Sequence, residues 1–403
     1  MNGSSANKNL ALATVAFGLC FAVWSLISPL APQFQKSLGL TDTQTSVLIA
    51  VPVILGSLVR IPMGILTDRF GGRRVFTGLI VFSILPVVFM GFANSYAMLL
   101  VGGFFLGMAG SSFAVGVPFS SRWFSAERQG TALGIYGAGN IGTAIASYSV
   151  PWIAAGYGTQ YAFWVFAPVL AVYAAVFWYL AEDAPGSRRP SSLSQNLGVV
   201  RSERLAWVFS LFYFVTFGGF VAFSLYLPKL LVDWFAFSKT DAGLRAAGFV
   251  VLATAARPLG GYLADKIGGA RLLAVVFGVA PVLALALAYE ATSPEIIGVT
   301  FSCLVVGILL GLGNGAVFKL VAQYFPKNTG VVTGVVGAAG GLGGFFPPIV
   351  MGIVRDLTGS YAIGLLLLAL FLVACLAVDI SLVTRRPGAA SGGERRAAGR
   401  PAA

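Results

Sequence analysis

Long apolar stretches recur along almost the whole chain. A helix that rises 1.5 Å per residue needs roughly 20 apolar residues to cross a hydrocarbon layer about 30 Å thick. Twelve stretches approach or exceed that length, at residues 10–31, 46–66, 75–93, 97–121, 130–154, 160–181, 205–228, 242–264, 271–290, 295–323, 330–354 and 361–384. Several contain Gly or Pro, which membrane helices tolerate better than soluble ones. The pattern predicts an all-α integral membrane protein with twelve transmembrane helices.

One long polar interruption divides these stretches into two groups of six. It covers residues 182–204, and we expect it to be a cytoplasmic linker between an N-terminal half at 1–181 and a C-terminal half at 205–386. Residues 387–403 are rich in Gly, Ala and Arg, which predicts a disordered cytoplasmic tail. The first apolar stretch is too long for the core of a signal peptide and lacks a clear cleavage site, so we expect it to be retained.

The two halves repeat a motif at the end of their second predicted span. Identical residues recur 197 positions apart at six places, Arg60/Arg257, Gly64/Gly261, Asp68/Asp265, Gly71/Gly268, Gly72/Gly269 and Arg74/Arg271. A second pair of Gly-rich stretches, 134–140 and 334–340, matches at an offset of 200. Parallel six-helix repeats of this kind build transporters whose binding site lies between the halves near the middle of the bilayer.

The charge composition changes the expected location of the protein, not its class. Charged residues make up 10% of the chain and apolar residues 57%, whereas soluble proteins average about 25% charged. The net charge is +12, but 18 basic residues fall in the loops of one side and 5 in those of the other. By the positive-inside rule, both termini are expected in the cytoplasm, in a cell inner membrane. This bias explains the charge without nucleic acid as a partner.

The chain lacks the side chains that most catalytic and metal sites need. It contains no histidine, and its three cysteines, Cys20, Cys303 and Cys375, lie far apart in apolar runs. Without histidine, the usual general base, metal ligand and proton shuttle are missing. We therefore expect no enzyme, no metal site and no cofactor.

Arg60 and Arg257 are the strongest functional signal in the sequence. Each lies eight residues before the Asp of its repeated loop, which is about 12 Å deeper along a helix. A charged residue at that depth costs at least ~2.5–3.5 kcal/mol, and all fourteen acidic residues fall in loops or near predicted span ends. The missing negative charge is most simply a substrate, since the planar guanidinium fork suits an oxyanion. The alternative is two structural arginines that backbone carbonyls and water satisfy.

The loop after the second span resembles the signature loop of the major facilitator superfamily. Residues 64–69 match its opening, and residues 261–271 repeat it. The resemblance implies the two-half major facilitator fold, and a cytoplasmic gate motif formed by Gly64, Asp68, Arg69, Arg74, Gly261, Asp265 and Arg271. From the residues alone, Asp68 can accept hydrogen bonds from helix N-termini or nearby arginines and so hold neighbouring helices together. The alternative is a solvated loop that obeys the positive-inside rule.

The Gly-rich stretches resemble the two nitrate-signature stretches of the nitrate/nitrite porter family. Residues 134–142 and 337–344 carry this resemblance, together with 213–218 and 313–319. It implies inward transport of a small inorganic anion, nitrate and also nitrite, by alternating access. The substrate-binding residues that it implies are Arg60, Arg257, Asn140, Tyr213, Phe113, Phe217, Gly137 and Gly337. The residues themselves leave other small anions open, such as formate, oxalate or an organophosphate, and leave core packing open for the two phenylalanines.

Lys319, within the tenth predicted span, is the candidate for energy coupling. Proton symport needs a group that changes protonation, yet no carboxylate lies clearly inside a span. Burial near the two arginines would disfavour the charged form of Lys319, so arrival of an anion would favour its protonation. We expect proton-coupled uptake by a monomer. The alternatives are nitrate/nitrite exchange and a lysine that extends to the cytoplasmic interface.

Overall fold

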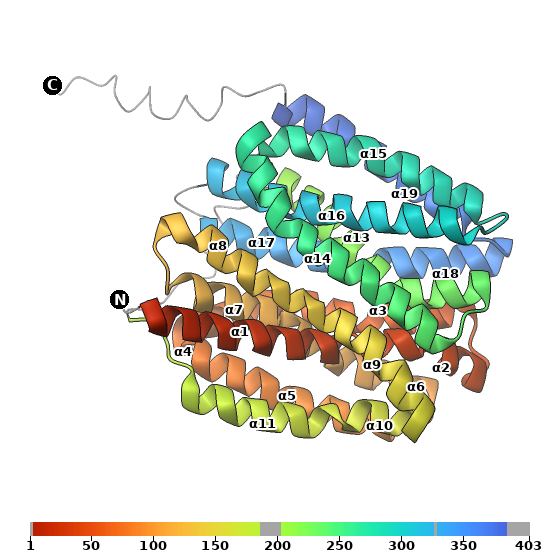
Figure 1. Cartoon of the computed structure of the whole chain (residues 1–403), viewed down its shortest axis with the longest axis horizontal. Coiled ribbons are helices and arrows are strands. Elements are labelled where there is room, and N and C mark those ends of the chain that lie inside the picture. The colour runs from red at the N-terminus through yellow and green to blue at the C-terminus, as the bar shows by residue number, and fades with distance from the viewer. Residues whose placement is uncertain (1–2, 186–202, 326–328, 385–403) are drawn as a thin grey trace.

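The computed structural model describes residues 3–185, 203–325 and 329–384, and the secondary structure over these ranges is helical. The helices lie side by side along the long dimension of the molecule, with α1 to α11 in one group and α13 to α19 in the other (Figure 1). The predicted linker at 182–204 lies mostly outside the described residues, and the predicted tail at 387–403 lies wholly outside them.

The helices of the first group cover the six predicted spans of the N-terminal half. They are α1 (Gly3–Trp24), η1 (Ser28–Leu30), α2 (Ala31–Leu38), α3 (Asp42–Leu58), α4 (Arg60–Phe70), α5 (Gly72–Gly91), α6 (Tyr96–Leu106), η2 (Gly107–Ser111), α7 (Ser112–Ser121), α8 (Ala126–Gly137), η3 (Ala138–Ile141), α9 (Gly142–Tyr157), α10 (Thr159–Trp164) and α11 (Phe166–Leu180).

The second group contains fewer and longer helices. They are α13 (Arg204–Phe235), α14 (Lys239–Ile267), α15 (Gly269–Glu290), α16 (Ile296–Tyr324), α17 (Thr329–Leu342), α18 (Phe346–Thr358), α19 (Ala362–Asp379) and η4 (Ile380–Thr384).

Eleven helical segments of the described chain are long and apolar enough to cross a membrane. The predicted fifth span, 130–154, is helical as α8, η3 and α9 but is not among the eleven. Its glycines and the polar residues Asn140, Thr143 and Ser147 lower its hydropathy. All three polar side chains are buried, so these polar positions face the protein rather than lipid.

The repeated motif makes the same turn in both halves. α4 ends at Gly71 with φ 88°, and α14 ends at Gly268, its partner in the repeat, with φ 93°. A residue with a Cβ rarely adopts such a positive φ, whereas glycine does so at little cost. The glycine spacing of the motif therefore sets where each second span stops and the third begins.

The two halves pack most extensively along α3 with α18 and along α9 with α14. Glycines bring these helices together: a Cβ on Gly352 of α18 would clash with Ser46 of α3, and a Cβ on Gly243 of α14 would clash with the carbonyl of Ser147 on α9. Small residues at such crossings are typical of membrane helices. Both contacts lie at the end of the bundle remote from the start of α1 (Figure 1), so the halves are closed together at that end.

Candidate functional site

Arg60 and Arg257 reach the same phenylalanine ring from opposite halves. Their guanidinium carbons lie 5.5 Å and 5.3 Å from the centre of the Phe217 ring, so the two groups are no farther apart than the sum of these distances. Arg60 is only 4% exposed, and no acidic residue of the described chain pairs with either arginine. Two neighbouring cations without a counter-charge in a buried setting favour an anion between them.

Each arginine has one polar partner and one spare donor. Arg60 Nη1 donates to the carbonyl of Gly337, in the other half, at 2.6 Å, and Arg257 Nη2 donates to Tyr213 Oη at 3.0 Å. Arg60 Nε and Arg257 Nη1 are buried and have no hydrogen-bond partner among the residues that the structure describes. A buried donor without a partner costs free energy, so both groups are available for a ligand.

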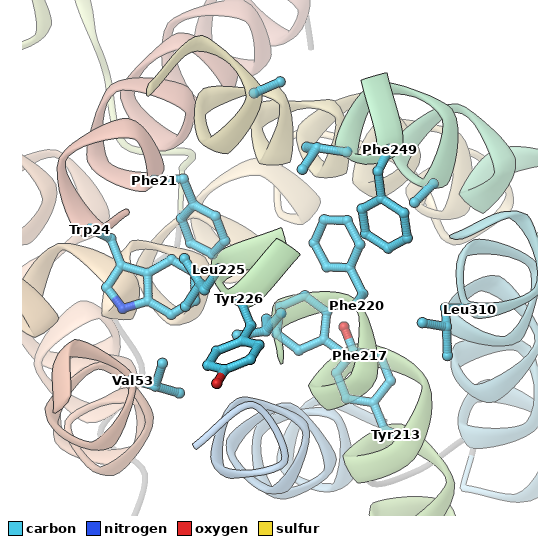
Figure 2. Close-up of a cluster of buried hydrophobic side chains, with 14 of the residues drawn as sticks. Phe21, Trp24, Val53, Tyr213, Phe217, Phe220, Leu225, Tyr226, Phe249 and Leu310 are labelled. Carbon is cyan, nitrogen blue, oxygen red and sulfur yellow. The ribbon is translucent and has the colours of Figure 1, made fainter. Parts of the chain in front are cut away.

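Aromatic rings surround the two guanidinium groups. Phe113 of α7 lies 6.4 Å from Phe217 of α13, centre to centre, and Tyr213 stacks on Phe217 at 5.0 Å with an angle of 2° between the rings. Phe318 of α16 packs against Tyr213 at 4.8 Å. Figure 2 shows Tyr213, Phe217 and Phe220 in succession along α13. Ring faces attract cations and exclude water, so the site is suited to a small flat anion held between the guanidinium groups.

The structure brings most, but not all, of the expected ligand residues together. Gly337 accepts from Arg60, and a Cβ there would lie 3.6 Å from the Phe113 ring. Gly137 faces open space, and its carbonyl accepts from Asn140 Nδ2 at 2.6 Å. Within the described chain no contact joins Asn140 to either arginine, although its Oδ1 is buried and unpaired. Asn140 and Gly137 therefore lie outside the immediate contacts of the arginine pair.

Packing explains why the second Gly-rich stretch has Gly340 where the first has Asn140. A Cβ on Gly340 would clash with the ring of Tyr213. Any side chain at that position would therefore move the phenol that accepts from Arg257. The two stretches differ because only one of them lies against a tyrosine.

Asn314 lies in the stretch 313–319 that carries part of the family resemblance, and its side-chain amide is buried. It is 1% exposed, and neither of its amide atoms has a hydrogen-bond partner in the described chain. It lies one helical turn from both Leu310 and Phe318 on α16, so the three share a face. Phe318 contacts Tyr213, and Leu310 packs against α13 at Gly219. We therefore place Asn314 beside the aromatic cluster.

The repeated acidic residue of each half forms an ion pair. Asp68 pairs with Arg122 at the end of α7, and Asp265 pairs with Lys319 on α16. Arg122 and Lys319 are themselves 197 positions apart. Each half therefore links its second and fourth spans by an equivalent ion pair. The 197-residue offset between Arg122 and Lys319 would have been enough to predict this equivalence from the sequence.

The other residues of the expected gate motif do not join these pairs. The Arg69 guanidinium carbon lies 5.2 Å from the centre of the Phe70 ring, and Arg74 and Arg271 are exposed. Among the residues described, none of these three arginines has an acidic partner. Gly64 and Gly261 face open space.

The expectation that Lys319 is buried beside the arginines is wrong. Its side chain is 43% exposed, and Asp265 neutralises its charge. The lysine is near the end of α16, where its long side chain reaches the carboxylate of Asp265 in the last turn of α14. The structure also corrects the expectation about carboxylates, because Asp379 of α19 is fully buried. One of its oxygens is unpaired and the other accepts from Thr384 Oγ1 at 3.2 Å.

A buried ion-pair network joins the halves at the end of the bundle remote from the start of α1. This network was not predicted from the sequence. The Lys229 side chain is fully buried, and its Nζ donates to Asp42 Oδ1 on α3 at 2.6 Å and to Asp233 Oδ2 at 2.5 Å. Tyr361 Oη donates to Asp233 and accepts from Lys229 at 3.2 Å. The lysine thus connects an acid of its own helix to an acid of the other half.

Backbone contacts strengthen the same closure. Asp356 of the second half accepts from the backbone N–H groups of Asp42, at 3.0 Å, and Thr43, at 2.7 Å, in the first turn of α3. A carboxylate is favourable at a helix N-terminus. Ser28 donates to the carbonyl of Leu225 across the same boundary. These contacts hold the two halves together at this end.

Comparisons with known proteins agree with this architecture. The profile of the Major Facilitator Superfamily matches residues 13–348 and 231–402. The nitrite extrusion protein of Bacillus subtilis is 42% identical over 360 residues, covering 89% of this chain and 90% of that protein. The probable nitrate transporter NarT of Staphylococcus epidermidis is 39% identical over 382 residues, covering 95% of this chain and 98% of that protein.

A solved structure shows the same fold at low sequence identity. The bacterial homologue of the human lysosomal transporter Spinster, in an inward-facing and occupied conformation, has a TM-score of 0.74 and 18% identity, and the match covers 96% of this chain and 98% of that one. The profile match and the two relatives each span most of the chain. The chain belongs to the major facilitator superfamily.

Proposed function

We propose that this protein transports nitrate, and also nitrite, across the cytoplasmic membrane by alternating access. The observation that carries the proposal is the arginine pair, one from each half, which shares Phe217 and has no acidic partner in the described chain. Relatives named as a nitrate transporter and a nitrite extrusion protein match nearly the whole chain. These relatives and the superfamily are transporters, so the protein is a transporter and not an enzyme.

An anion at the site would change the energy of bringing the halves together. Arg60 and Arg257 repel one another when the site is empty, because both are positive and no acid neutralises them. A monoanion between them offsets this repulsion and bonds to both halves. The loaded protein can then close and rock about the site, whereas the empty protein resists closure.

The ion pairs at the two ends supply the gates for this motion. The Lys229 network closes the end remote from α1, while the Asp68–Arg122 and Asp265–Lys319 pairs hold helices within each half at the other end. The excess of basic residues in the loops of one side supports cytoplasmic termini. On that orientation the Lys229 network faces outward and the described conformation is closed to the outside. We take the functional unit to be a monomer.

Counterflow in proteoliposomes tests the proposed substrate. Purified protein reconstituted with unlabelled nitrate inside should accumulate labelled nitrate from outside, and nitrite should compete. Oxalate should compete weakly, because it is larger than nitrate and doubly charged, whereas formate, a small planar monoanion, is the stricter competitor. Counterflow that formate or oxalate supports better than nitrate would assign the site to another anion.

Two buried asparagines are expected to adjust substrate preference. Asn314 Nδ2 is a buried donor without a partner in the described chain, and Asn140 Nδ2 has one N–H left beside the one that it donates to Gly137, so Asn140→Ala and Asn314→Ala each remove an N–H that could donate to the anion. A hydrogen bond to a charged group contributes about 1.5–3 kcal/mol, so loss of one from the bound anion raises KM roughly 10-fold or more. We expect the nitrate-to-nitrite ratio of KM values to change while expression is unchanged.

Asn9→Ala is the matched control, because Asn9 is also fully buried but its amide bonds to Ser5 and Glu182 near the start of α1. It should leave the ratio of the two KM values unchanged. Unchanged kinetics for both anions in Asn140→Ala and Asn314→Ala would exclude a role in substrate choice.

We propose that uptake is coupled to protons, and the repeat provides a test of which residue carries the coupling. Lys319 and Arg122 occupy equivalent places, so a gate role predicts that Lys319→Gln and Arg122→Gln slow transport alike. Asp379 is a buried carboxylate inside a span, so Asp379→Asn should abolish accumulation driven by a pH gradient and spare anion exchange.

Uptake of labelled nitrate into proteoliposomes, with and without an imposed pH gradient, measures these effects. If only Lys319→Gln loses pH-driven accumulation, the lysine carries the coupling. If accumulation by the wild-type protein ignores the gradient, the protein is an exchanger.

A further inference from the structure

An apolar groove of about 430 Å³ lies between α4 and α5 in the first half. Its lining includes Met63, Leu66 and Phe70 from α4, and Gly78 and Phe82 from α5. Arg74 is the one charged residue in the lining. The groove is therefore an apolar trough with a single cationic side chain along it, and it is separate from the arginine pair and the two gates.

The groove opens toward the membrane. Leu66 is 38% exposed and Phe70 is 42% exposed, as expected of side chains that face hydrocarbon in a membrane protein. Gly78 forms a hollow in the trough, since a Cβ added there would meet no atom within 4 Å. A larger residue at that position would occupy the trough without disturbing the helix packing.

Two guanidinium groups lie at one end of the trough. Arg74 is in the first turn of α5, and Phe82 is eight residues later, about 12 Å deeper along the helix. Arg69 lies over the ring of Phe70, which lines the groove. Neither arginine has an acidic partner in the described chain, and the nearby Asp68 is paired with Arg122. The trough thus has a cationic mouth and an apolar body.

We propose that this groove binds an anionic phospholipid. The phosphate of the headgroup lies between Arg69 and Arg74, and one acyl chain follows the trough past Gly78. Charge complementarity selects the headgroup, and the apolar body selects a lipid over free phosphate. Each arginine near a membrane surface contributes roughly a fivefold preference for an anionic headgroup. The proposal does not depend on which anion the protein transports.

Native mass spectrometry of the full-length protein tests this site. The protein is incubated with equal amounts of phosphatidylglycerol and phosphatidylcholine, and the bound lipid is counted after removal of detergent. The wild-type protein should retain phosphatidylglycerol roughly 25-fold better, since two arginines contribute about fivefold each. Arg74→Gln should lower this preference about fivefold, and Gly78→Phe should reduce retention of both lipids.

The second half provides matched controls. Arg271 is the repeat partner of Arg74 but does not line the groove, and Gly278 is a glycine of α15 that also faces open space. Arg271→Gln and Gly278→Phe should retain phosphatidylglycerol as the wild-type protein does. A thermal unfolding profile like that of the wild-type protein verifies folding of each variant. Equal retention of the two lipids by the wild-type protein, or equal loss in the control variants, would overturn the proposal.

Discussion

Arg60→Lys and Arg257→Lys are each expected to reduce nitrate transport by about 100-fold or more while the protein still folds. Lysine keeps the positive charge but loses the planar fork that donates in two directions at once. Arg60 uses Nη1 for Gly337 and leaves Nε for the anion, and a single ammonium cannot serve both. Hydrogen bonds to charged groups are worth about 1.5–3 kcal/mol each, so losing one to two of them accounts for this reduction.

Initial rates of labelled nitrate counterflow at matched protein amounts measure the effect. Arg245→Lys is the control, because Arg245 is exposed and pairs with Asp241 one turn earlier on the surface of α14. It should transport at the wild-type rate. Near wild-type transport by Arg60→Lys or Arg257→Lys would mean that the guanidinium shape is irrelevant, and the arginine pair would no longer explain binding.

Lys229→Met is expected to open the protein at the end that the structure shows closed. The substitution removes the buried cation that Asp42 and Asp233 share, and leaves Asp42 with only the longer contact to Arg355, at 3.8 Å. Removing one partner of a buried ion pair costs about 3–5 kcal/mol, which is enough to shift the population between two conformations by roughly 10²–10³. Nitrate uptake should fall because the protein no longer closes at this end during its cycle.

Thiol labelling reports this shift. A cysteine replacing Ser46, which lies in the α3–α18 contact, should become reactive from that side in Lys229→Met, in a background without Cys20, Cys303 and Cys375. Lys239→Met is the control, since Lys239 also bonds across the halves, to Gln33 at 2.9 Å, but is exposed. It should change labelling little. Identical labelling in Lys229→Met and wild type would show that the network does not hold this end closed.

The sequence was sufficient to predict the fold and to single out the two arginines, whose role as anion ligands stays a prediction. Apolar length and the 197-residue repeat indicated two six-helix halves, and the depth of Arg60 and Arg257 indicated that both would lie between them. The structure confirms that they meet at Phe217. This success has a physical cause, because an arginine inside an apolar span is costly and stands out without any knowledge of its neighbours.

The predictions failed where a residue's environment depends on distant parts of the chain. Lys229 gives no local signal of burial, because its partner Asp42 is 187 residues away. Lys319 lies in an apolar run, yet its side chain extends to Asp265 and stays exposed. Periodicity and composition predict that a segment is helical, but they do not predict which residues of the folded protein it packs against.

The equivalent ion pairs of the two halves suggest how this protein could have been assembled. If one six-helix gene was duplicated and joined, the features that both copies inherited serve what both copies do: each half moves as a rigid body and supplies one guanidinium group to the central pair. Features present in only one copy arose afterwards, and among them are Asn140, Tyr213 and Asn314. Attempts to redesign the anion that this protein accepts should therefore begin with the unshared residues and keep the duplicated ones.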